Sequence, residues 1–571
     1  MTATGTDTAT SNGTWHSHHL FLHSGAADTD AFLVRSAAPL LDGLVAAGEA
    51  AGWFFIRYGE DGPHLRIRVR GLSGPAAGRL TQELARAARE VPAVPGPWPS
   101  RHGEVRAVPY EPETERYGGP RALPVAEEVF ADSTRVVLDA LREAPARAAD
   151  AARLTRAADL AHATAYALGM DRLTAARWLR RHAAGWRWVT GLPLLPGAAV
   201  HARVNTVYAA QRSGLAHRAR TLREGLARGA GQPWLAHWAD RVREADALLR
   251  TDAGGGLSQS ASEWVWGSQL HMLFNRLGVG PDEERAVCRL AARTLLETEE
   301  PAAFFPPGHT APDLQYLERS KFQIGRGEDT ALRPLPAAAP HPPAAVPAPE
   351  TDLPAAPLPD VPLGAVLAGR ASVRGALGGP LDAAALGSLL WHALAGGAGT
   401  ATGAPDGPER APAHRPYPSA GALYMARVRL LVLDVAGVEP GTYDCVPERR
   451  TLRRVGPAPS VGDVKALSTY LSRPATEPDW IGVDEAPVVL GLYADLGLLR
   501  RRYGLRALRL ALLETGHLAQ NLLLTAGALG LGGTPLGGFH DDLAHELLGL
   551  DDLEQPLQYL LPLGRRAVES P

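Results

Sequence analysis

The first stretch whose residues could do chemistry is His64-Leu-Arg-Ile-Arg-Val-Arg70, in which four basic residues alternate with three apolar ones. A period of two predicts a β-strand, on which Arg66, Arg68 and Arg70 share one face. Successive arginine side chains then leave the backbone roughly 7 Å apart. Arginine stays charged at any relevant pH and offers a planar fork of hydrogen-bond donors. This face could therefore hold a carboxylate or a developing oxyanion, or it could be a solvated outer face.

A second candidate is the histidine in Ser268-Gln-Leu-His-Met-Leu-Phe-Asn-Arg276. We predict a helix here, on which His271 and Asn275 share a face at positions i and i+4. Histidine titrates near neutral pH and can move protons, but a hydrogen-bonded histidine in a helical core fits the same pattern.

Two other stretches of the first half carry charged or metal-ligating residue types. The residues from Trp15 to His23 alternate like a strand and include four histidines. These fall on both faces with no carboxylate between them, so the pattern fits a metal site poorly and we expect none. Val108 to Gly119 is a turn-rich loop that contains Glu113 and Arg116, and by itself it indicates no chemistry.

The second half offers patterns suited to a phosphate and to a flat ligand. Arg370, Ser372 and Arg374 form a basic, hydroxyl-bearing patch that could bind phosphate or be a solvated turn. Ser419 suits the N-cap of a helix, and Gly421 allows the backbone to approach a flat ligand closely.

Periodicity predicts the elements that must position these residues. The first half should contain a helix, a hairpin and a helical middle, at Ala31 to Gly52, Trp53 to Arg70 and Val125 to Leu249. The second half should contain two buried strands, a core helix and a glycine-rich loop, at Val428 to Asp434, Ala486 to Tyr493, Leu505 to Leu529 and Gly530 to Phe539. This mixture predicts the α+β class.

A stretch rich in proline and alanine, Arg333 to about Pro362, separates the halves. It holds too few bulky apolar residues to bury a core, and its prolines favour an extended spacer. We therefore expect two domains, residues 14–326 and 362–567, joined by a linker over 327–361.

Composition excludes several classes of protein. The 571 residues are 45% hydrophobic and 21% charged, with a net charge of −3 that gives no general attraction to nucleic acid or acidic membranes. The only two cysteines, Cys288 and Cys445, lie in different halves, which argues against a disulfide scaffold or a cysteine-ligated metal. The polar N-terminus lacks an apolar signal core and no stretch is apolar enough for a membrane span, so we expect a cytoplasmic protein.

Taken in order, the first-half motifs WFFIRY, HLRIRVR, YEPETERYGG and SxxHMxxNR resemble the C-terminal elimination domain of class I lanthipeptide dehydratases and the related stand-alone proteins of thiopeptide biosynthesis. The resemblance covers roughly Trp15 to Leu317. It implies a glutamate elimination site formed by Arg66, Arg68, Glu113, Arg116 and His271.

In such a site, glutamate leaves glutamylated Ser or Thr of a precursor peptide to give dehydroalanine or dehydrobutyrine. The arginines would stabilise the leaving carboxylate and the enolate, His271 would move protons, and Glu113 would orient an arginine. Because no large glutamylation domain precedes this segment, we expect a separate enzyme that uses glutamyl-tRNA to load the substrate.

Two alternatives for the first half stay open. The same fold hosts thiopeptide pyridine synthases, which join two dehydroalanines in a formal cycloaddition. The full set of Arg, Glu and His favours elimination, because a cycloaddition has no glutamate to hold. The segment could also bind the peptide without catalysis and deliver it to the second half.

The second-half motifs RxSxR, PSAGALY, RYG before LETGHLAQN, GLGGTPLGGF and LLPLGR resemble the nitroreductase fold, and within it the SagB/McbC-type azoline dehydrogenases. The resemblance implies FMN and a homodimer with the flavin at its interface. It places Arg370, Ser372, Arg374 and Arg565 near the phosphate and ribityl chain. It places Ser419, Gly421, Gly537 and Gly538 near the isoalloxazine.

The catalytic pair departs from the family's usual Lys-Tyr and is Arg502-Tyr503 here. Arginine cannot act as a base because its pKa is too high, so Tyr503, acidified by Arg502, is our candidate proton acceptor. A generic nitro- or quinone-reducing flavoenzyme is the alternative for this half.

Both halves together indicate maturation of a ribosomal precursor peptide, as in the fused elimination/dehydrogenase proteins of lactazole-like thiopeptide clusters. An azoline-forming cyclodehydratase would then be a further partner. The linker would raise the local concentration of the second active site for a peptide leaving the first.

Overall fold

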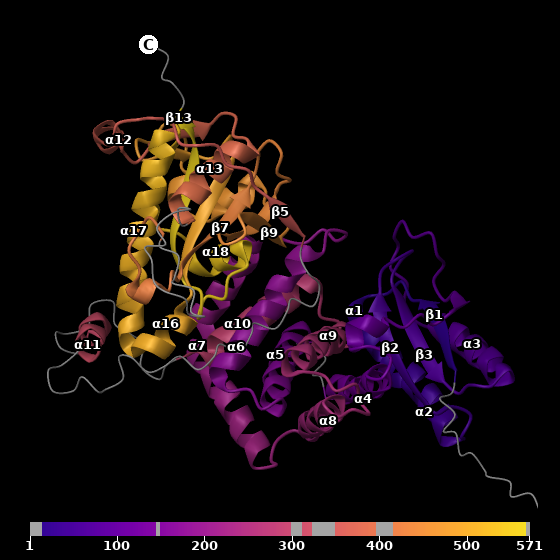
Figure 1. Cartoon of the computed structure of the whole chain (residues 1–571). Coiled ribbons are helices and arrows are strands. Elements are labelled where there is room, and N and C mark those ends of the chain that lie inside the picture. The colour runs from indigo at the N-terminus through magenta and orange to yellow at the C-terminus, as the bar shows by residue number, and fades with distance from the viewer. Residues whose placement is uncertain (1–13, 144–148, 298–310, 322–348, 396–414, 567–571) are drawn as a thin grey trace, which may run out of the picture. The chain divides into compact units, whose positions relative to one another are not determined.

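The computed structural model describes residues 14–143, 149–297, 311–321, 349–395 and 415–566. The chain divides into two units, of which the first comprises residues 1–183 and 203–297 and the second residues 184–202 and 298–571. Figure 1 shows the first unit mainly in indigo and magenta and the second mainly in orange and yellow. Most of the predicted linker lies outside the described residues, so the domain boundaries remain predictions.

The first unit contains a four-stranded antiparallel sheet in the order β2-β3-β1-β4. Its strands are β1 (Trp15–Phe21), β2 (Gly52–Tyr58), β3 (His64–Arg70) and β4 (Val105–Val108). The predicted hairpin is confirmed, and its register pairs Phe54 with Arg68 and Phe55 with Ile67. Because side chains alternate along a strand, Ile67 enters the core while Arg68 and Phe54 share the opposite face.

Helices make up the rest of the first unit (Figure 1). The helix predicted over residues 31–52 is wrong at its C-terminal end: the helical segment begins at Ala26 and stops at Ala46, close to Gly48, whose φ of 71° breaks it. In order, the segments are α1 (Ala26–Phe32), the π-helical η1 (Leu33–Ala37), α2 (Ala38–Ala46), α3 (Gly74–Ala88), the 3₁₀ turn η2 (Thr114–Tyr117), α4 (Leu123–Arg142), α5 (Ala149–Ala167), α6 (Arg172–Gly185), α7 (Gly197–Ala227), α8 (Pro233–Leu249), α9 (Gln259–Leu277) and α10 (Pro281–Leu295).

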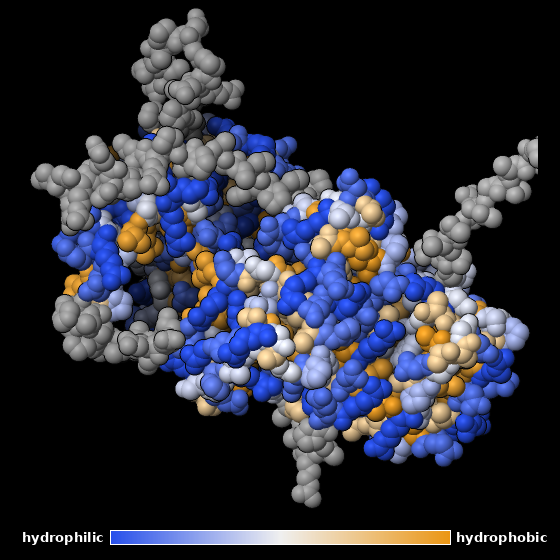
Figure 2. Space-filling view, turned by 90° about the horizontal axis from the view of Figure 1, so that it is seen from below, coloured by the Kyte–Doolittle hydropathy of each residue, from blue (hydrophilic) through white to orange (hydrophobic). Residues whose placement is uncertain are grey.

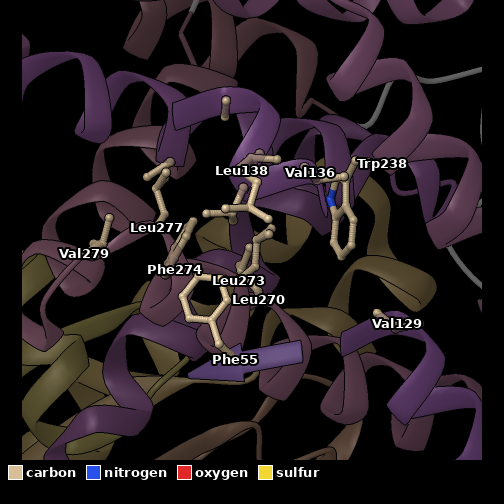
Figure 3. Packing of buried hydrophobic residues seen from close by; sticks show 14 of the residues in the cluster. Phe55, Val129, Val136, Leu138, Trp238, Leu270, Leu273, Phe274, Leu277 and Val279 are labelled. Carbon is tan, nitrogen blue, oxygen red and sulfur yellow. The ribbon is translucent and has the colours of Figure 1, made fainter. Parts of the chain in front are cut away.

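The core of the first unit forms where α9 meets the sheet and its neighbouring helices. Leu270, Leu273, Phe274 and Leu277 recur at helical spacing along α9 and are fully buried. Figure 3 shows Phe274 among these leucines, with Phe55 of β2 nearby. The same helix carries His271, so this packing also fixes a candidate catalytic side chain.

The second unit is built on a nine-stranded mixed sheet in the order β10-β6-β13-β11-β7-β8-β9-β5, with β12 paired to β13. Every residue of the central strand β11 is buried. The strands are β5 (Glu350–Asp352), β6 (Gly375–Gly378), β7 (Ala426–Val432), β8 (Gly441–Val446), β9 (Thr451–Gly456), β10 (Ile481–Gly482), β11 (Val488–Ala494), β12 (Gly532–Gly533) and β13 (Leu557–Arg566).

The predicted core helix of the second unit is confirmed as α17 (Ala507–Ala528), which packs on the sheet beside α13 (Ala383–Leu394) (Figure 1). Its buried face carries Leu518, Leu522 and Ala526 at helical spacing, one turn after Glu514. The other helical segments are η3 (Trp186–Trp188), α11 (Pro312–Arg319), α12 (Leu363–Gly369), η5 (Ala420–Ala422), α14 (Val461–Ala466), α15 (Thr469–Ser472), α16 (Leu496–Tyr503), η6 (Gly504–Arg506) and α18 (Asp541–Leu548).

The described residues have a mostly hydrophilic visible face and two buried cysteines. Among the described residues, no helix is both long and apolar enough to cross a membrane. The face seen in Figure 2 is largely hydrophilic, with apolar residues in small groups. Cys288 and Cys445 are both buried and unpaired, and burial raises the pKa of each thiol well above its usual value.

Truncating Phe274 to alanine should destabilise the first unit strongly. The ring is fully buried, so its loss leaves a cavity and should lower the free energy of unfolding by about 3–5 kcal/mol. Urea denaturation followed by circular dichroism measures this change. The control is Trp264→Ala on the same helix, where the side chain is 68% exposed and the expected change is within about 0.5 kcal/mol. Equal losses in the two variants would contradict the described packing.

Candidate active sites

The arginine face of β3 is covered by aromatic side chains. The guanidinium carbon of Arg68 lies 4.6 Å from the ring centroid of Tyr110 and 5.5 Å from that of Phe54. Tyr110 is held in place by a hydrogen bond from its hydroxyl to Glu127 (2.9 Å). Arg68 is therefore a partly desolvated cation, and the alternative of a solvated outer face does not describe it.

Arg66 lies on the same face, but its contacts are with the hairpin itself. Its Nε donates to His64 (3.1 Å), a terminal nitrogen pairs with Glu60 (3.3 Å), and its guanidinium carbon stacks 3.4 Å from the Tyr58 ring centroid. The described residues thus give Arg66 no contact with the other predicted elimination residues, whereas Arg68 approaches Phe54 and Tyr110.

Glu113 and Arg116 form an ion pair (2.8 Å) across the start of η2. Arg116 also donates from Nε to the hydroxyl of Ser268 on α9 (3.3 Å). His271 lies one turn further along α9, so η2 and α9 together bring Glu113, Arg116 and His271 to one place. Glu113 holds an arginine, which is the arrangement expected of a residue that orients one.

The imidazole of His271 is fixed by a carboxylate that the sequence did not reveal. Glu284 on α10 lies 2.9 Å from His271 Nδ1 through Oε2 and 2.6 Å from His182 Nε2 through Oε1. Its side chain is only 1% exposed. Burial alone would raise the pKa of Glu284, but the charge of His271 and hydrogen bonds from His182 and His271 outweigh it and lower the pKa to about 2. The contact with Glu284 through Nδ1 fixes the orientation of the His271 ring.

Glu284 and Ser268 are the site residues that sequence reasoning missed. Glu284 belongs to an acidic first helical turn after Pro281, which resembles ordinary helix capping. The sequence did contain one sign of its burial. Glu284 lies one helical turn before Cys288, so both side chains share the apolar face of α10, where Cys288 is buried.

In the second unit, residues predicted for the FMN phosphate lie on segments that meet at β12 and the C-terminal end of β13. Ser372 forms a bridge with Gly533 of β12, which pairs with β13. Arg565 of β13 lies opposite Gly378 of β6. Arg370, Arg374 and Arg565 are exposed, and Arg374 lies 3.7 Å from Asp479. Three exposed guanidinium groups next to a hydroxyl are a donor set that fits a phosphate dianion.

Ser419 and Gly421 lie in a strained loop that Glu514 holds. Ser419 occupies the predicted N-cap position, that of η5, but its side chain makes no capping bond there. Its hydroxyl instead accepts from Tyr424 N (2.8 Å) and donates to Glu514 (2.7 Å). Glu514 also accepts from the amide of Ala426 (2.8 Å). These hydrogen bonds hold the loop in a strained conformation, since Ala422 and Tyr424 both have positive φ values, 53° and 48°.

Tyr503, at the end of α16, adjoins this loop. A Cβ added to Gly421, whose φ is 61°, would lie 2.5 Å from the Tyr503 hydroxyl oxygen, so only glycine fits there. The guanidinium carbon of Arg502 lies 5.8 Å from the Tyr503 ring centroid. Its buried Nε has no hydrogen-bond partner in the part of the chain that the structure describes.

Gly537 and Gly538 lie in the segment that follows β12. The Ser468 hydroxyl donates to the Gly538 carbonyl (2.5 Å), and a Cβ on Gly538 would meet the Tyr470 ring at 3.3 Å. The residues predicted for FMN thus lie on three segments: the C-terminal end of β13 with Arg565, the loop with Ser419, and the segment after β12 with Gly538.

Comparison with known proteins assigns each half of the chain. Residues 15–295 match the family model "Lantibiotic biosynthesis dehydratase C-term", and residues 367–565 match the model "Nitroreductase family". "Putative nitroreductase MJ1384" of Methanocaldococcus jannaschii is 39% identical over 149 residues, which are 26% of this chain and 69% of the relative. "Microcin B17-processing protein McbC" of Escherichia coli is 30% identical over 148 residues, which are 25% of this chain and 52% of the relative.

Among solved structures, "Pyridine synthase, TbtD, from thiomuracin biosynthesis" is similar to part of the chain. It is 22% identical, covers 49% of this chain and 97% of its own, and has a TM-score of 0.40.

Replacing Glu284 with glutamine should remove a pH-dependent part of the stability of the first unit. The pKa of Glu284 is lowered in the folded state from 4.5 to about 2. Its carboxylate therefore stabilises the fold fully above about pH 4.5, and this contribution is lost as the pH falls through about 2. In urea titrations, the free energy of unfolding should fall more steeply over this range for the wild type than for E284Q.

The matched control is Glu283→Gln, which removes the neighbouring exposed carboxylate and should keep the wild-type pH dependence. The same pH dependence in E284Q and the wild type would show that the carboxylate does not pair with the two histidines.

Proposed function

The chain belongs to the nitroreductase family through its second unit and carries a lantibiotic dehydratase C-terminal domain in its first, and on this basis we propose that it matures a ribosomal peptide by two reactions. The first unit eliminates glutamate from glutamylated Ser or Thr to give dehydroalanine or dehydrobutyrine. The second unit oxidises thiazolines or oxazolines to thiazoles or oxazoles with FMN.

The observation that best supports elimination is the linked set Glu113–Arg116–Ser268 beside His271 and Glu284. His271 Nε2 takes the α proton of the glutamylated residue. The C–H electron pair forms the Cα=Cβ bond, and the Cβ–O bond breaks so that glutamate leaves as a carboxylate. Glu284 stabilises the resulting imidazolium, and Arg116 stabilises the negative charge that develops on the substrate.

The two rival activities of the first unit make different use of these residues. A pyridine-forming cycloaddition has no leaving glutamate, so it would not need the cation that Glu113 orients. A peptide-binding module would not need a histidine whose ring is oriented by a buried carboxylate. The pairing of His271 with Glu284 therefore favours catalysis.

In the second unit, Arg370, Ser372, Arg374 and Arg565 would hold the FMN phosphate, with Ser419, Gly421, Gly537 and Gly538 near the ring system. FMN supplies the acceptor for the hydride that leaves the azoline ring. The proton lost in the same aromatisation would go to the oxygen of Tyr503 acting as a phenolate, because the neighbouring Arg502 stays protonated and cannot accept it. Glu514 acts by holding the loop against which Tyr503 packs.

The proposed partners follow from these reactions. A glutamylation enzyme that uses glutamyl-tRNA supplies the ester, and a cyclodehydratase supplies the azoline. We also propose that the protein acts as a homodimer in which two copies complete each flavin site, as the resemblance of its second half implies.

Substitutions at His271 and Tyr503 should separate the two activities. A glutamylated, azoline-bearing peptide is incubated with the full-length protein, and mass spectrometry follows the loss of glutamic acid and of two hydrogens per azoline. His271→Ala should lower elimination by roughly 10²- to 10⁴-fold and leave oxidation intact, because general acid–base catalysis contributes about that much. Tyr503→Phe should lower azoline oxidation and leave elimination intact. Elimination at the wild-type rate in His271→Ala would leave the first unit as a binding module or a cycloaddition enzyme.

Removing the Arg565 guanidinium should weaken FMN more than riboflavin, which lacks the phosphate. A hydrogen bond to a charged group contributes about 1.5–3 kcal/mol, so Arg565→Ala should raise the Kd of FMN roughly tenfold or more. Flavin fluorescence quenching measures both affinities. An equal loss for FMN and riboflavin would contradict a phosphate contact.

A further inference from the structure

β4 forms one edge of the sheet in the first unit, and half of its backbone groups have no partner among the described residues. The strand pairs with β1 on one side only. The amide of Phe21 donates to the carbonyl of Glu104 (2.9 Å), which shows that alternate residues from Glu104 onward turn their backbone groups to β1. The backbone groups of Val105 and Ala107 therefore point away from the sheet.

This edge is accessible. Ala107 is exposed, and Val105 is half-buried because its side chain packs against the core of the unit. The N–H and C=O groups of both residues thus face outward with the spacing of a sheet ladder. Such a row of groups can pair with an extended peptide, which then adds to the sheet as another strand.

Alternation also fixes which side chains of an added peptide would reach the arginine face of β3. The register places His19 of β1 between Arg106 of β4 and Arg66 of β3, so these three side chains share one face of the sheet. Arg68 lies on the same face, two residues after Arg66. Every second side chain of a peptide paired with β4 would therefore lie on the face that carries Arg68.

β4 leads directly into the loop that carries candidate elimination residues. Two residues after the strand, the ring centroid of Tyr110 lies 4.6 Å from the guanidinium carbon of Arg68. The same loop continues to Glu113 and Arg116, which form an ion pair (2.8 Å). A peptide paired with β4 therefore runs beside these residues.

We propose that the precursor peptide binds to the first unit as an added β-strand on the edge of β4. This inference rests on the proposed elimination activity. Hydrogen bonds to the peptide backbone leave its side chains free, so the glutamylated residue can point over the arginine face towards Arg116 and His271. Because β4 offers only two outward-facing residues, the pairing is short and the peptide can leave after the reaction.

N-methylation of the peptide backbone tests this pairing. The probe is a short precursor peptide in which the processed serine is replaced by 2,3-diaminopropionate, acylated on its side-chain nitrogen with glutamate, because the amide link prevents elimination. A series of such peptides carries one N-methyl group at successive positions around this residue. Calorimetry with the full-length protein gives each Kd. The Kd should rise roughly threefold to tenfold at every second position, the effect of one backbone hydrogen bond, and change little at the positions between.

A substitution on the protein side removes the partner group. Ala107→Pro deletes an outward-facing N–H that makes no bond to β1, so the ladder between β1 and β4 should persist. The variant should raise the Kd of the unmethylated peptide by roughly threefold to tenfold. The matched control is Ala107→Val, which keeps the N–H and should keep the wild-type Kd. Thermal unfolding reports folding, and the N-methyl series with the wild type decides the inference if Ala107→Pro does not fold.

The outcomes separate this inference from the proposed activity. Equal effects at all N-methyl positions, or wild-type affinity in a folded Ala107→Pro variant, overturn the peptide site. A lower mass of Ala107→Pro than of the wild type in sedimentation would show that a second copy of the chain pairs with this edge, which also overturns it. If the alternation is found but the glutamyl ester is not eliminated, the peptide site stands and the proposed elimination fails. If Ala107→Pro eliminates glutamate with the wild-type kcat/KM, elimination stands and the peptide site fails.

Discussion

A single buried carboxylate sets the geometry of the first unit. Glu284 could not remain ionised in the protein interior alone, since the desolvation of an isolated carboxylate costs several kcal/mol. It is stable there because His182 of α6 and His271 of α9 both bond to it. One group thus ties α6, α9 and α10 together, fixes the orientation of the His271 ring, and offers a counter-charge to a protonated imidazole.

The second unit also contains a buried carboxylate that joins distant segments, and there it holds a strained loop. Glu514 projects from the buried face of α17 and accepts from both Ser419 and the Ala426 amide. The loop between them has backbone conformations that cost energy at Ala422 and Tyr424. A rigid helix therefore maintains a strained loop, and the strain is compensated by hydrogen bonds to a charged acceptor, which are stronger than neutral ones.

Local sequence patterns predicted those helices and strands of both units whose formation is determined by residues close together in the chain. The alternation in β3 and the apolar spacing in α17 each specify an element and its buried face, and the structure has both. The partners of Glu284 and Glu514 come from segments distant in sequence, so no local pattern indicates whether such a carboxylate is solvated or buried. Ser419 stands at the predicted N-cap position, but the sequence could not show that its hydroxyl bonds to a distant carboxylate rather than to the helix.

The burial of both cysteines matters for an enzyme that makes the proposed product. Dehydroalanine is an electrophile that thiolates attack at its β carbon, so an accessible thiolate near the site of its formation would be alkylated. Cys288, one turn after Glu284 on α10, is the cysteine nearest in sequence to the elimination residues, yet it is fully enclosed and held in its protonated form. Cys445 is buried in the same way in the other unit. With both thiols buried, the olefin of the proposed elimination would not alkylate the protein at cysteine.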